Sequence, residues 1–297
     1  MELGIVGLGK MGGNMVVRLI QGGHKVVAYD RSPDAVNAAA ANGAAPASSL
    51  KELVEELSAP RAVWVMVPDG APTEETINGL VDHMASGDII IDGGNSKFTD
   101  DVRRAKSLAE KGIEYMDVGT SGGVWGLKVG YCLMIGGEKE IFDYLEPIFK
   151  TLAPADGYGY MGSHGAGHFV KMVHNGVEYA MMQAYAEGFA LMKASEFQLD
   201  CAKIADLWQH GSVVRSWLLE LGAAELAENP ELKGIKPYVN DSGEGRWTVQ
   251  AAVDRGVPLP AITAALFARF ESRQEDSFAL KFLNGLRNQF GGHTVVK

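Results

Sequence analysis

The chain has 297 residues, of which 46% are hydrophobic and 22% charged, so it is ordinary globular material with enough length for two domains. Its net charge of −10 excludes a duplex nucleic-acid partner, which would require a basic face, but is compatible with an anionic small molecule where a few cations converge. Two distant cysteines, Cys132 and Cys201, predict buried thiols in a reducing compartment and neither a disulfide framework nor a zinc site. The first predicted strand begins at about Leu3 and leaves no room for a signal peptide, and no uncharged apolar run reaches about 18 residues. We therefore expect a cytoplasmic protein that does not enter a membrane.

The N-terminal segment combines a short apolar strand, a glycine-rich turn and a helical pattern. The turn, GLGKMG at 7–12, has the form GxGxxG, and a second strand at 25–30 ends at an acid, Asp30. This context matches the dinucleotide-binding fingerprint, in which the first glycine turns the chain, the second admits the pyrophosphate and the third lets helix meet strand. A glycine-rich turn without a ligand is the weaker alternative. The predicted cofactor contacts in this segment are Gly7, Leu8, Gly9, Met11 and Gly12.

Asp30 and Arg31 bear on the choice of dinucleotide. The carboxylate of Asp30 can accept hydrogen bonds from the adenosine ribose, but it would repel the 2′-phosphate of NADP by up to roughly 4 kcal/mol at about 4 Å. Arg31 acts in the other direction, since a guanidinium beside the acid can partly neutralise it and bind a phosphate. We predict that NAD is preferred and NADP tolerated.

Two further apolar strands end in polar or glycine-rich turns. Residues 62–67 are followed by Pro68, and residues 88–92 are followed by two glycines, Asn95 and a serine. The carboxyl ends of strands in an open α/β sheet face the crevice where ligands bind. Val67, Pro68 and Asn95 are therefore candidate ligand contacts, although Asn95 equally fits a turn or a helix N-cap.

The strand predicted at 113–121 ends in Ser121, Gly122 and Gly123. Backbone amides exposed by paired glycines, with a hydroxyl beside them, suit a carboxylate ligand. The alternative is a flexible hairpin loop leading into a strand at 131–135.

A long helix is predicted from Gly165 to Lys193, a stretch without proline. At about 100° per residue, four polar side chains fall within roughly 60° of one another, while Met172, Val173 and Val177 point elsewhere and are expected to pack. The four are Lys171, His174, Asn175 and Glu178. A lysine and a carboxylate on one face of a buried helix suit acid–base chemistry, because desolvation brings the lysine pKa down toward neutrality. The alternative is a charged pair on a solvated face.

The order of these elements predicts two domains. After Ile148 the strand signals stop, residues 157–167 look like a linker, and the rest is helical. Further helices are predicted at 201–209, 213–226, 249–254, 262–270 and 276–289. The predicted fold is an α/β Rossmann-like dinucleotide-binding domain at 1–163, followed by an all-α substrate and oligomerisation domain at 164–297, joined by the long helix.

Four motifs together resemble a known family. GLGKMG at 7–12, DGGNS at 92–96, DVGTSGG at 117–123 and GAGHFVKMVHNGVEY at 165–179 resemble the β-hydroxyacid dehydrogenase superfamily, and most closely the short-chain, NAD-type branch of its 6-phosphogluconate dehydrogenase family. The likeness runs nearly end to end. It implies oxidative decarboxylation of 6-phospho-D-gluconate to D-ribulose 5-phosphate and CO2 with reduction of NAD(P), as in the pentose phosphate pathway and gluconate utilisation.

The resemblance also assigns roles to residues. It implies that Lys171 is the general base and later acid, and that Glu178 is the second acid. The residues that would hold the carboxylate and hydroxyl end of the sugar acid are Asn95, Ser121, Gly122, Gly123, His174 and Asn175. The 6-phosphate would be bound by Tyr179 and Arg269, and by Arg287 and His293 from the tail of a neighbouring subunit in a homodimer or homotetramer.

Two features limit the likeness. The longer members duplicate the helical domain, and they carry a phosphate-binding lysine where this chain has Ser242, so Arg246 or another cation must compensate. The rival interpretations are a non-decarboxylating dehydrogenase of the 3-hydroxyisobutyrate or tartronate-semialdehyde type, and a dinucleotide-sensing regulator without turnover. Glu178, Tyr179 and the tail at 287–293 disfavour the first, and an intact lysine–glutamate pair disfavours the second. No metal is required, because oxidation itself creates the ketone that stabilises the decarboxylation.

Overall fold

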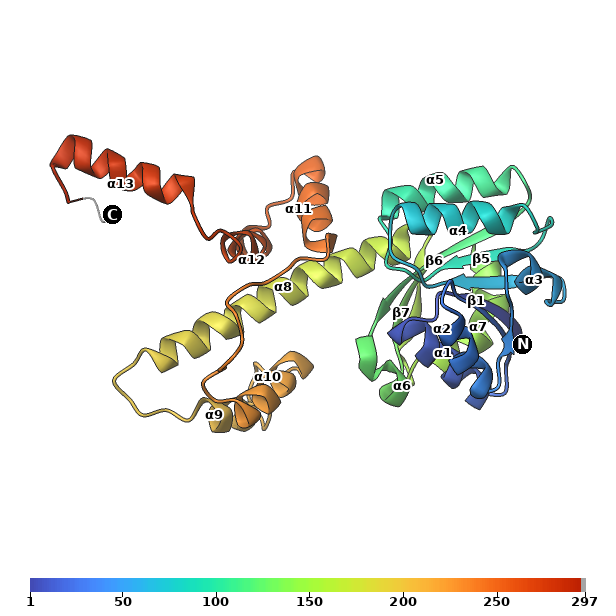
Figure 1. Ribbon diagram of the computed structural model, residues 1–297, viewed down its shortest axis with the longest axis horizontal. Helices are drawn as coiled ribbons and strands as arrows, with labels where there is room; N and C mark the ends of the chain where they lie inside the picture. The colour runs from blue at the N-terminus through green and yellow to red at the C-terminus, as the bar shows by residue number, and fades with distance from the viewer. Residues whose placement is uncertain (295–297) are drawn as a thin grey trace. The chain divides into compact units, whose positions relative to one another are not determined.

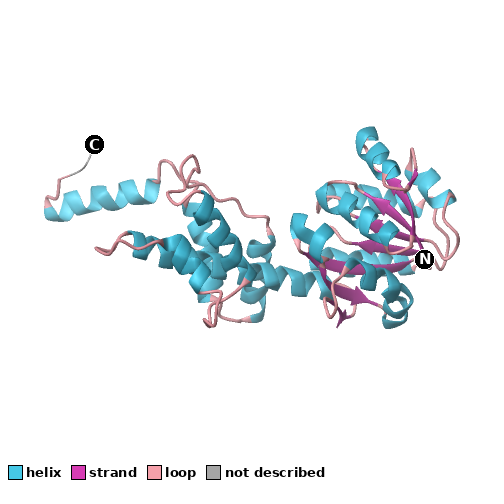
Figure 2. Cartoon of the chain, turned by 90° about the horizontal axis from the view of Figure 1, so that it is seen from below, coloured by secondary structure: helices cyan, strands magenta, loops and turns pink. Residues whose placement is uncertain are grey.

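The computed structural model describes residues 1–294, which form two compact units, Met1–His174 and Asn175–Lys297. The point of division between the two units lies within helix α8 (Ala166–Lys193). Figures 1 and 2 show that the sheet belongs to the first unit and that the second is helical, so the predicted fold class is confirmed. The domain boundary at 163/164 stays a prediction, and residues 295–297 of the predicted second domain lie outside the described residues.

The first unit is built on one eight-stranded sheet. The strand order is β3-β2-β1-β4-β5-β6-β7-β8, and the paired strands are parallel except for the antiparallel pair β6·β7. The strands are β1 (Glu2–Val6), β2 (Lys25–Tyr29), β3 (Ala45–Pro46), β4 (Ala62–Val65), β5 (Ile89–Asp92), β6 (Glu114–Ser121), β7 (Cys132–Gly137) and β8 (Tyr158–Gly162). This order brings the ends of β1, β4, β5 and β6, where the sequence predicts ligand contacts, to one edge of the sheet.

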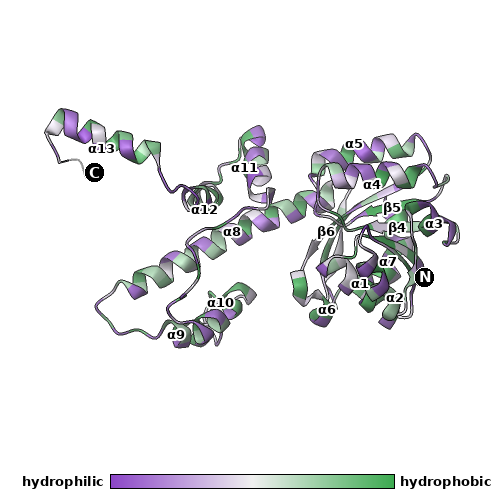
Figure 3. Cartoon of the chain, viewed as in Figure 1, coloured by the Kyte–Doolittle hydropathy of each residue, from purple (hydrophilic) through white to green (hydrophobic). Residues whose placement is uncertain are grey.

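Helices cover both faces of the sheet (Figure 1). One hydrophobic core joins the sheet to α1 (Lys10–Gln21), α2 (Pro33–Ala41) and α7 (Lys139–Leu152). A second core on the opposite face joins it to α3 (Leu50–Glu55), α4 (Ala71–Val81) and α5 (Phe98–Ala109). The central strands β4 (AVWV) and β5 (IIID) are almost entirely apolar, because both of their faces are buried; Figure 3 colours hydrophobic residues green.

The second unit contains the remainder of α8 and five shorter helices, α9 (Cys201–Leu207), α10 (Trp217–Glu228), α11 (Glu244–Arg255), α12 (Pro260–Glu271) and α13 (Phe278–Gly291). Several of these helices have an N-cap side chain that accepts a backbone amide of the first turn. The hydroxyl of Ser216, for example, accepts a hydrogen bond from the amide of Leu219 at 3.1 Å. Helix α11 lies close to α8, because a Cβ at Gly176 would lie 2.7 Å from Thr248 Cγ2, and one at Gly245 would lie 2.6 Å from the Tyr179 ring. Both contacts depend on glycine.

The structure corrects four expectations. Residues 157–167 contain strand β8, which the sequence hides because glycine occupies two of its five positions. Cys132 is exposed, since it begins β7 at the rim of the sheet; Cys201 is buried as expected. Val173 and Val177 are exposed, because the polar stripe and not the valines occupies the inner face of α8. Helix α11 begins at Glu244, five residues before the predicted start, since its first turn contains a glycine.

Two short elements connect β6 to β7. The segment between β6 and β7 is not a plain hairpin loop, because it forms a 3-10 turn, η1 (Gly123–Trp125), and the short helix α6 (Gly126–Val129).

Over residues 1–294 no helix combines the length and the apolar character that a bilayer span requires.

The two-faced core yields a stability prediction. Phe149 is fully buried, with its ring 6.3 Å from Trp64 and 5.5 Å from Phe142 between centroids. Phe149→Ala should lower the free energy of unfolding by about 3–5 kcal/mol in urea titration, because it leaves a cavity. Tyr144→Ala on the exposed side of the same helix should cost no more than about 0.5 kcal/mol. Equal losses for the two variants would contradict the packing of α7 on the sheet.

Candidate active site

The glycine-rich turn between β1 and α1 has the geometry that a bound pyrophosphate needs. Gly7 has φ +94, a conformation that favours glycine. A Cβ on Gly12 would lie 2.0 Å from the carbonyl oxygen of Gly7, whereas a Cβ on Gly9 would meet no atom within 4 Å. Helix α1 starts at Lys10 without a side-chain cap, so its first amides are available to an anion. These residues fit a dinucleotide, with the space in front of Gly9 left for the phosphates.

Asp30 closes this turn from the end of β2. One carboxylate oxygen accepts the amide of Leu8 at 2.6 Å and the other accepts the amide of Ser32 at 2.8 Å. Each oxygen retains a lone pair for a ribose hydroxyl. Arg31 is turned to Glu75 at 3.2 Å in an exposed ion pair, a contact that competes with any phosphate for its guanidinium.

A pocket of about 480 Å³ lies beside the turn. Six of its lining residues are predicted cofactor contacts: Gly7, Gly9, Asp30, Arg31, Val67 and Pro68. Four other predicted cofactor contacts do not line this pocket: Leu8, Met11, Gly12 and Asn95. Leu8 and Gly12 are buried in the turn, and Met11 packs against the core under α1.

Asn95 joins two of the segments that the sequence singles out. Its backbone is left-handed, with φ +56, and its side chain is bonded twice to Thr120 at the end of β6. The side-chain amide donates to the Thr120 carbonyl at 3.0 Å, and its oxygen accepts the Thr120 amide at 2.8 Å. Asn95 is thus a turn residue that fixes the end of β6 next to Ser121. Gly122 and Gly123 follow with positive φ at the start of η1.

Lys171 lies against the same strand. It is only 5% exposed, and a Cβ on Gly119 would lie 2.3 Å from the Lys171 Cβ. The first unit therefore brings together Asn95, Ser121 and the stem of Lys171 along β6, with His174 half-buried one turn later on α8. Burial of the lysine is the condition under which an amine can act as a base at neutral pH.

The start of α8 is held on β6 by a buried carboxylate. Asp117 accepts the amides of Gly165 at 2.6 Å and His168 at 2.9 Å. The pKa of Asp117 lies above its usual value, because the effect of burial exceeds the opposing effect of the nearby His168. The carboxylate takes the place of an N-cap on the helix that carries Lys171.

The second unit holds the rest of the polar stripe. The buried amide of Asn175 donates to Glu244, which begins α11. The buried Tyr179 hydroxyl accepts the amide of Ser242 at 3.0 Å, and the guanidinium of Arg269 stacks on the Tyr179 ring at 3.5 Å. Glu178 is half-buried. Tyr179 and Arg269, predicted to bind one phosphate, are in contact.

Two arginines bind Asp241, the residue before Ser242. Arg246 donates to both oxygens of Asp241, at 2.6 and 3.1 Å, and Arg273 donates to one at 2.8 Å. The bond from Arg246 is the main cause that lowers the pKa of Asp241 to about 2. Arg246 is therefore engaged by a carboxylate, and Arg269 is the cation nearest to Tyr179 in position to receive a phosphate. Sequence patterns missed Asp241, Glu244 and Arg273, although the two acids, which stand just before the segment GRWT at 245–248, are a signal.

Arg287 and His293 are not joined to this group. Helix α13, which carries Arg287, buries none of its residues, and both side chains are exposed. Within residues 1–294, neither makes a hydrogen bond or ion pair with Tyr179 or Arg269. The backbone of His293 accepts a bond from Asn288 at 2.9 Å.

The structure combines a dinucleotide-binding α/β unit with a helical unit, and helix α8, which has residues in both units, carries a buried lysine. These features define a two-domain, nicotinamide-dependent dehydrogenase. Known proteins agree. The family described as the NAD binding domain of 6-phosphogluconate dehydrogenase matches residues 2–162, and that described as the 6-phosphogluconate dehydrogenase C-terminal domain matches residues 167–290. The chain belongs to the 6-phosphogluconate dehydrogenase family.

Individual relatives differ in length. The NAD-dependent, decarboxylating 6-phosphogluconate dehydrogenase of Haloferax volcanii is 45% identical over all of this chain and 99% of its own. The decarboxylating enzyme of Lactococcus lactis is 37% identical over 98% of this chain, which covers 66% of that relative. The Plasmodium falciparum 6-phosphogluconate dehydrogenase structure has a TM-score of 0.85 at 30% identity, covering all of this chain and 66% of its own. A 3-hydroxyisobutyrate dehydrogenase from Mycobacterium tuberculosis, at TM-score 0.74 and 24% identity over 96% of this chain and 99% of its own, shares the fold.

The geometry of the turn predicts which glycine NAD binding requires. Gly12→Ala should weaken NAD binding about tenfold or more by calorimetry, because the added carbon forces the turn away from Gly7. Gly13→Ala is the matched control: its Cβ would lie 3.3 Å from the Leu8 carbonyl oxygen, a distance that a small shift accommodates. Equal NAD affinity in both variants would show that the close approach is unimportant.

Proposed function

We propose that this protein oxidises and decarboxylates 6-phospho-D-gluconate to D-ribulose 5-phosphate and CO2, with NAD as the preferred electron acceptor. The observation that carries the proposal is the burial of Lys171 against β6, beside the segment of Asn95 and Ser121, in a member of this family. A carboxylate at the end of β2, Asp30, supports the preference for NAD over NADP.

The chemistry follows from the residue types on α8. When bound, the oxidised dinucleotide accepts the hydride from C3 of the sugar acid. Lys171, as a neutral amine, takes the proton of the 3-hydroxyl, leaving a ketone next to the carbon that bears the carboxylate. The ammonium of Lys171 then returns a proton to the ketone oxygen while the carboxylate leaves as CO2 and its bonding electrons form an enediol. Glu178, two turns along the same face, protonates the carbon that lost CO2.

The other candidate residues support a place for each end of the substrate. The substrate carboxylate suits the backbone amides of Gly122 and Gly123 and the hydroxyl of Ser121. The substrate hydroxyls suit the side-chain amides of Asn95 and Asn175 and the imidazole of His174. The stacked pair of Tyr179 and Arg269 suits the 6-phosphate, because a guanidinium has five donors and the contacts of Arg269 with the Asn240 carbonyl and the Met182 sulfur use two. Glu178 and this pair disfavour a non-decarboxylating dehydrogenase of small hydroxy acids.

We further propose that the working enzyme is a cytoplasmic homo-oligomer in which the tail of one subunit completes the site of another. The apolar residues of α13 support this, since Phe278 and Phe290 are 80% and 79% exposed. So does an apolar groove of about 790 Å³ between α8 and α10, lined by Phe189, Leu219 and Leu226 among others. Exposed apolar surfaces of this kind are typical of protein interfaces.

A direct assay tests the activity. The purified protein should reduce NAD faster than NADP in the presence of 6-phosphogluconate and release one CO2 per dinucleotide reduced. Lys171→Ala should lower kcat by about 10² to 10⁴, because the proton acceptor is lost. Lys193→Ala, which removes an exposed lysine paired with Glu231 at the other end of α8, should leave kcat unchanged. Dinucleotide reduction without CO2 would exclude the decarboxylating function.

Mixed oligomers test the shared site. Lys171→Ala and Arg287→Ala subunits should each be inactive alone, but coexpression should restore about a quarter of wild-type activity, since one site in each mixed pair has both residues intact. If the tail serves its own subunit, no mixed site is intact and activity stays absent. Size-exclusion chromatography with light scattering gives the number of subunits in each preparation.

A further inference from the structure

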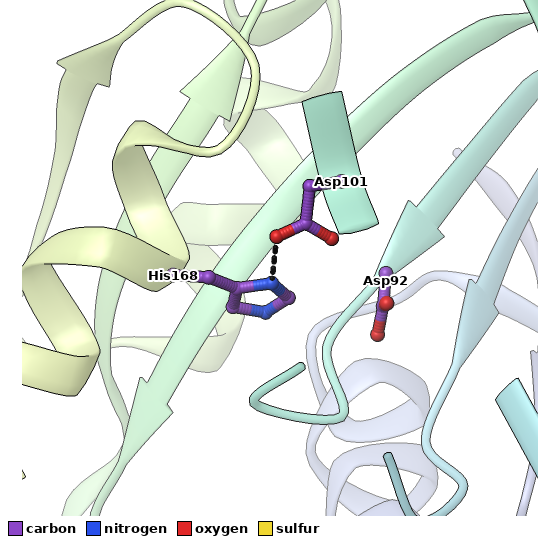
Figure 4. Close-up of side chains that lie close together, drawn as sticks. All are labelled: Asp92, Asp101 and His168. Carbon is purple, nitrogen blue, oxygen red and sulfur yellow. Dashed lines mark hydrogen bonds and ion pairs between the residues drawn. The ribbon is translucent and has the colours of Figure 1, made fainter. Parts of the chain in front are cut away.

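A buried group of ionisable side chains lies in the first unit and is not used by the proposed mechanism. It comprises Asp92 at the end of β5, Asp101 and Arg104 on α5, Tyr115 on β6 and His168 on α8, each no more than 3% exposed. Figure 4 shows Asp92, Asp101 and His168 facing one another from three different elements. Burying so many charges is costly unless each is paired, so the group calls for an explanation.

One end of the group holds the turn that carries Asn95. Asp92 accepts the amide of Gly94 at 2.9 Å through one oxygen and the hydroxyl of Ser96 at 2.7 Å through the other. Asn95 lies between these two anchors, in a left-handed conformation, and is itself bonded to Thr120. The carboxylate therefore fixes the turn on both sides of Asn95.

The other end holds the first turn of α8. The Nδ1 atom of His168 is 2.8 Å from a carboxylate oxygen of Asp101, and the backbone amide of His168 donates to Asp117 at 2.9 Å. His168 precedes Lys171 by three residues, so the two side chains are neighbours on the helix. Side chain and backbone of one residue thus anchor the helix immediately before the proposed base.

Tyr115 and Arg104 connect the two ends. The Tyr115 hydroxyl lies 2.7 Å from Asp101 and 3.2 Å from Asp92, and Nη1 of Arg104 lies 3.3 Å from Asp92 and 3.8 Å from Asp101. Burial opposes a charged His168, but the adjacent Asp101 outweighs it and raises the pKa of His168 to about 10. Asp92 and Asp101 therefore both lie beside the guanidinium of Arg104, and Asp101 also pairs with the imidazole of His168.

The guanidinium of Arg104 argues against a metal ion at this group. Asp92, Asp101 and His168 can present three ligand atoms within 4.8 Å of one another. Arg104 already provides a cation at both carboxylates, and Glu74 holds it from the far side at 3.0 Å. A divalent ion would add like charge beside the guanidinium.

We propose that His168 is a positioning residue for the proton transfer: through Asp101, Tyr115 and Asp92 it ties the first turn of α8 to the turn of Asn95. Lys171 and the substrate-contacting turn are then held as one rigid piece. The inference rests on the proposed function for what is being positioned, but the mechanical coupling between the two turns exists whatever the substrate is. A group that merely stabilised α8 would affect its own surroundings and leave the Asn95 turn unchanged.

Hydrogen exchange read by mass spectrometry tests the coupling without substrate. In His168→Gln, amides of residues 93–97 as well as 165–172 should exchange about tenfold faster than in the wild type, and Asp92→Asn should show the same reciprocal effect on 165–172. His24→Gln, the same change at a half-buried histidine that bonds Thr151 on α7, should alter neither segment. Loss of protection confined to the mutated turn in either variant would overturn the inference.

Kinetics provide the second readout. His168→Gln should lower kcat with 6-phosphogluconate about 10- to 100-fold, because a displacement of about 1 Å at the base is enough. Adding Asp101→Asn should cause little further loss, since both changes break one link. Normal kcat in a folded His168→Gln protein would overturn the positioning role. Absence of turnover in the wild type would instead refute the proposed function, and the exchange experiment would still decide the coupling.

Discussion

The contact between the start of α8 and strand β6 is the constraint on which the site depends. Asp117 accepts two amides from the first turn of the helix, and the backbones approach so closely that a Cβ on Gly167 would lie 2.6 Å from the Asp117 carbonyl oxygen. A charged carboxylate is a costly group to bury, and the free helix amides are what make it tolerable. The helix can therefore start in only one place, and Lys171 follows on the inner face of its second turn.

The same helix orders the chemistry along its length. In the first unit it presents the buried lysine to β6, and in the second it presents Asn175 to Glu244 and Tyr179 to Ser242. Polar groups occupy its inner face while several valines lie outside, which is the reverse of an ordinary core helix. Glycines at 176 and 245 permit the close packing of α11 that satisfies these polar groups. A rise of about 1.5 Å per residue then sets the spacing between Lys171 and Glu178, the proposed base and acid.

The sequence alone predicts the features that depend on the local geometry of the backbone. The glycine spacing predicted the cofactor turn because each glycine answers to a separate steric demand, and the periodicity of 165–193 predicted both the helix and its polar face. It failed where partners are distant in the chain. The pairing of His168 with Asp101 and of Gly165 with Asp117 joins residues far apart in sequence, and no spacing rule reveals it. Strand β8 was missed because its glycines resemble a linker.

The outer strands of the sheet have a consequence for how copies of this protein can meet. At one margin β3 is only two residues long and ends in Pro46, which has no amide hydrogen to offer. At the other, β8 is interrupted by glycine and has its two tyrosine rings packed on Phe142. Neither margin is a good template for a foreign strand, so sheet extension is disfavoured at both. The proposed association between subunits would then use the helical surfaces, where strand pairing cannot extend it into fibrous aggregates.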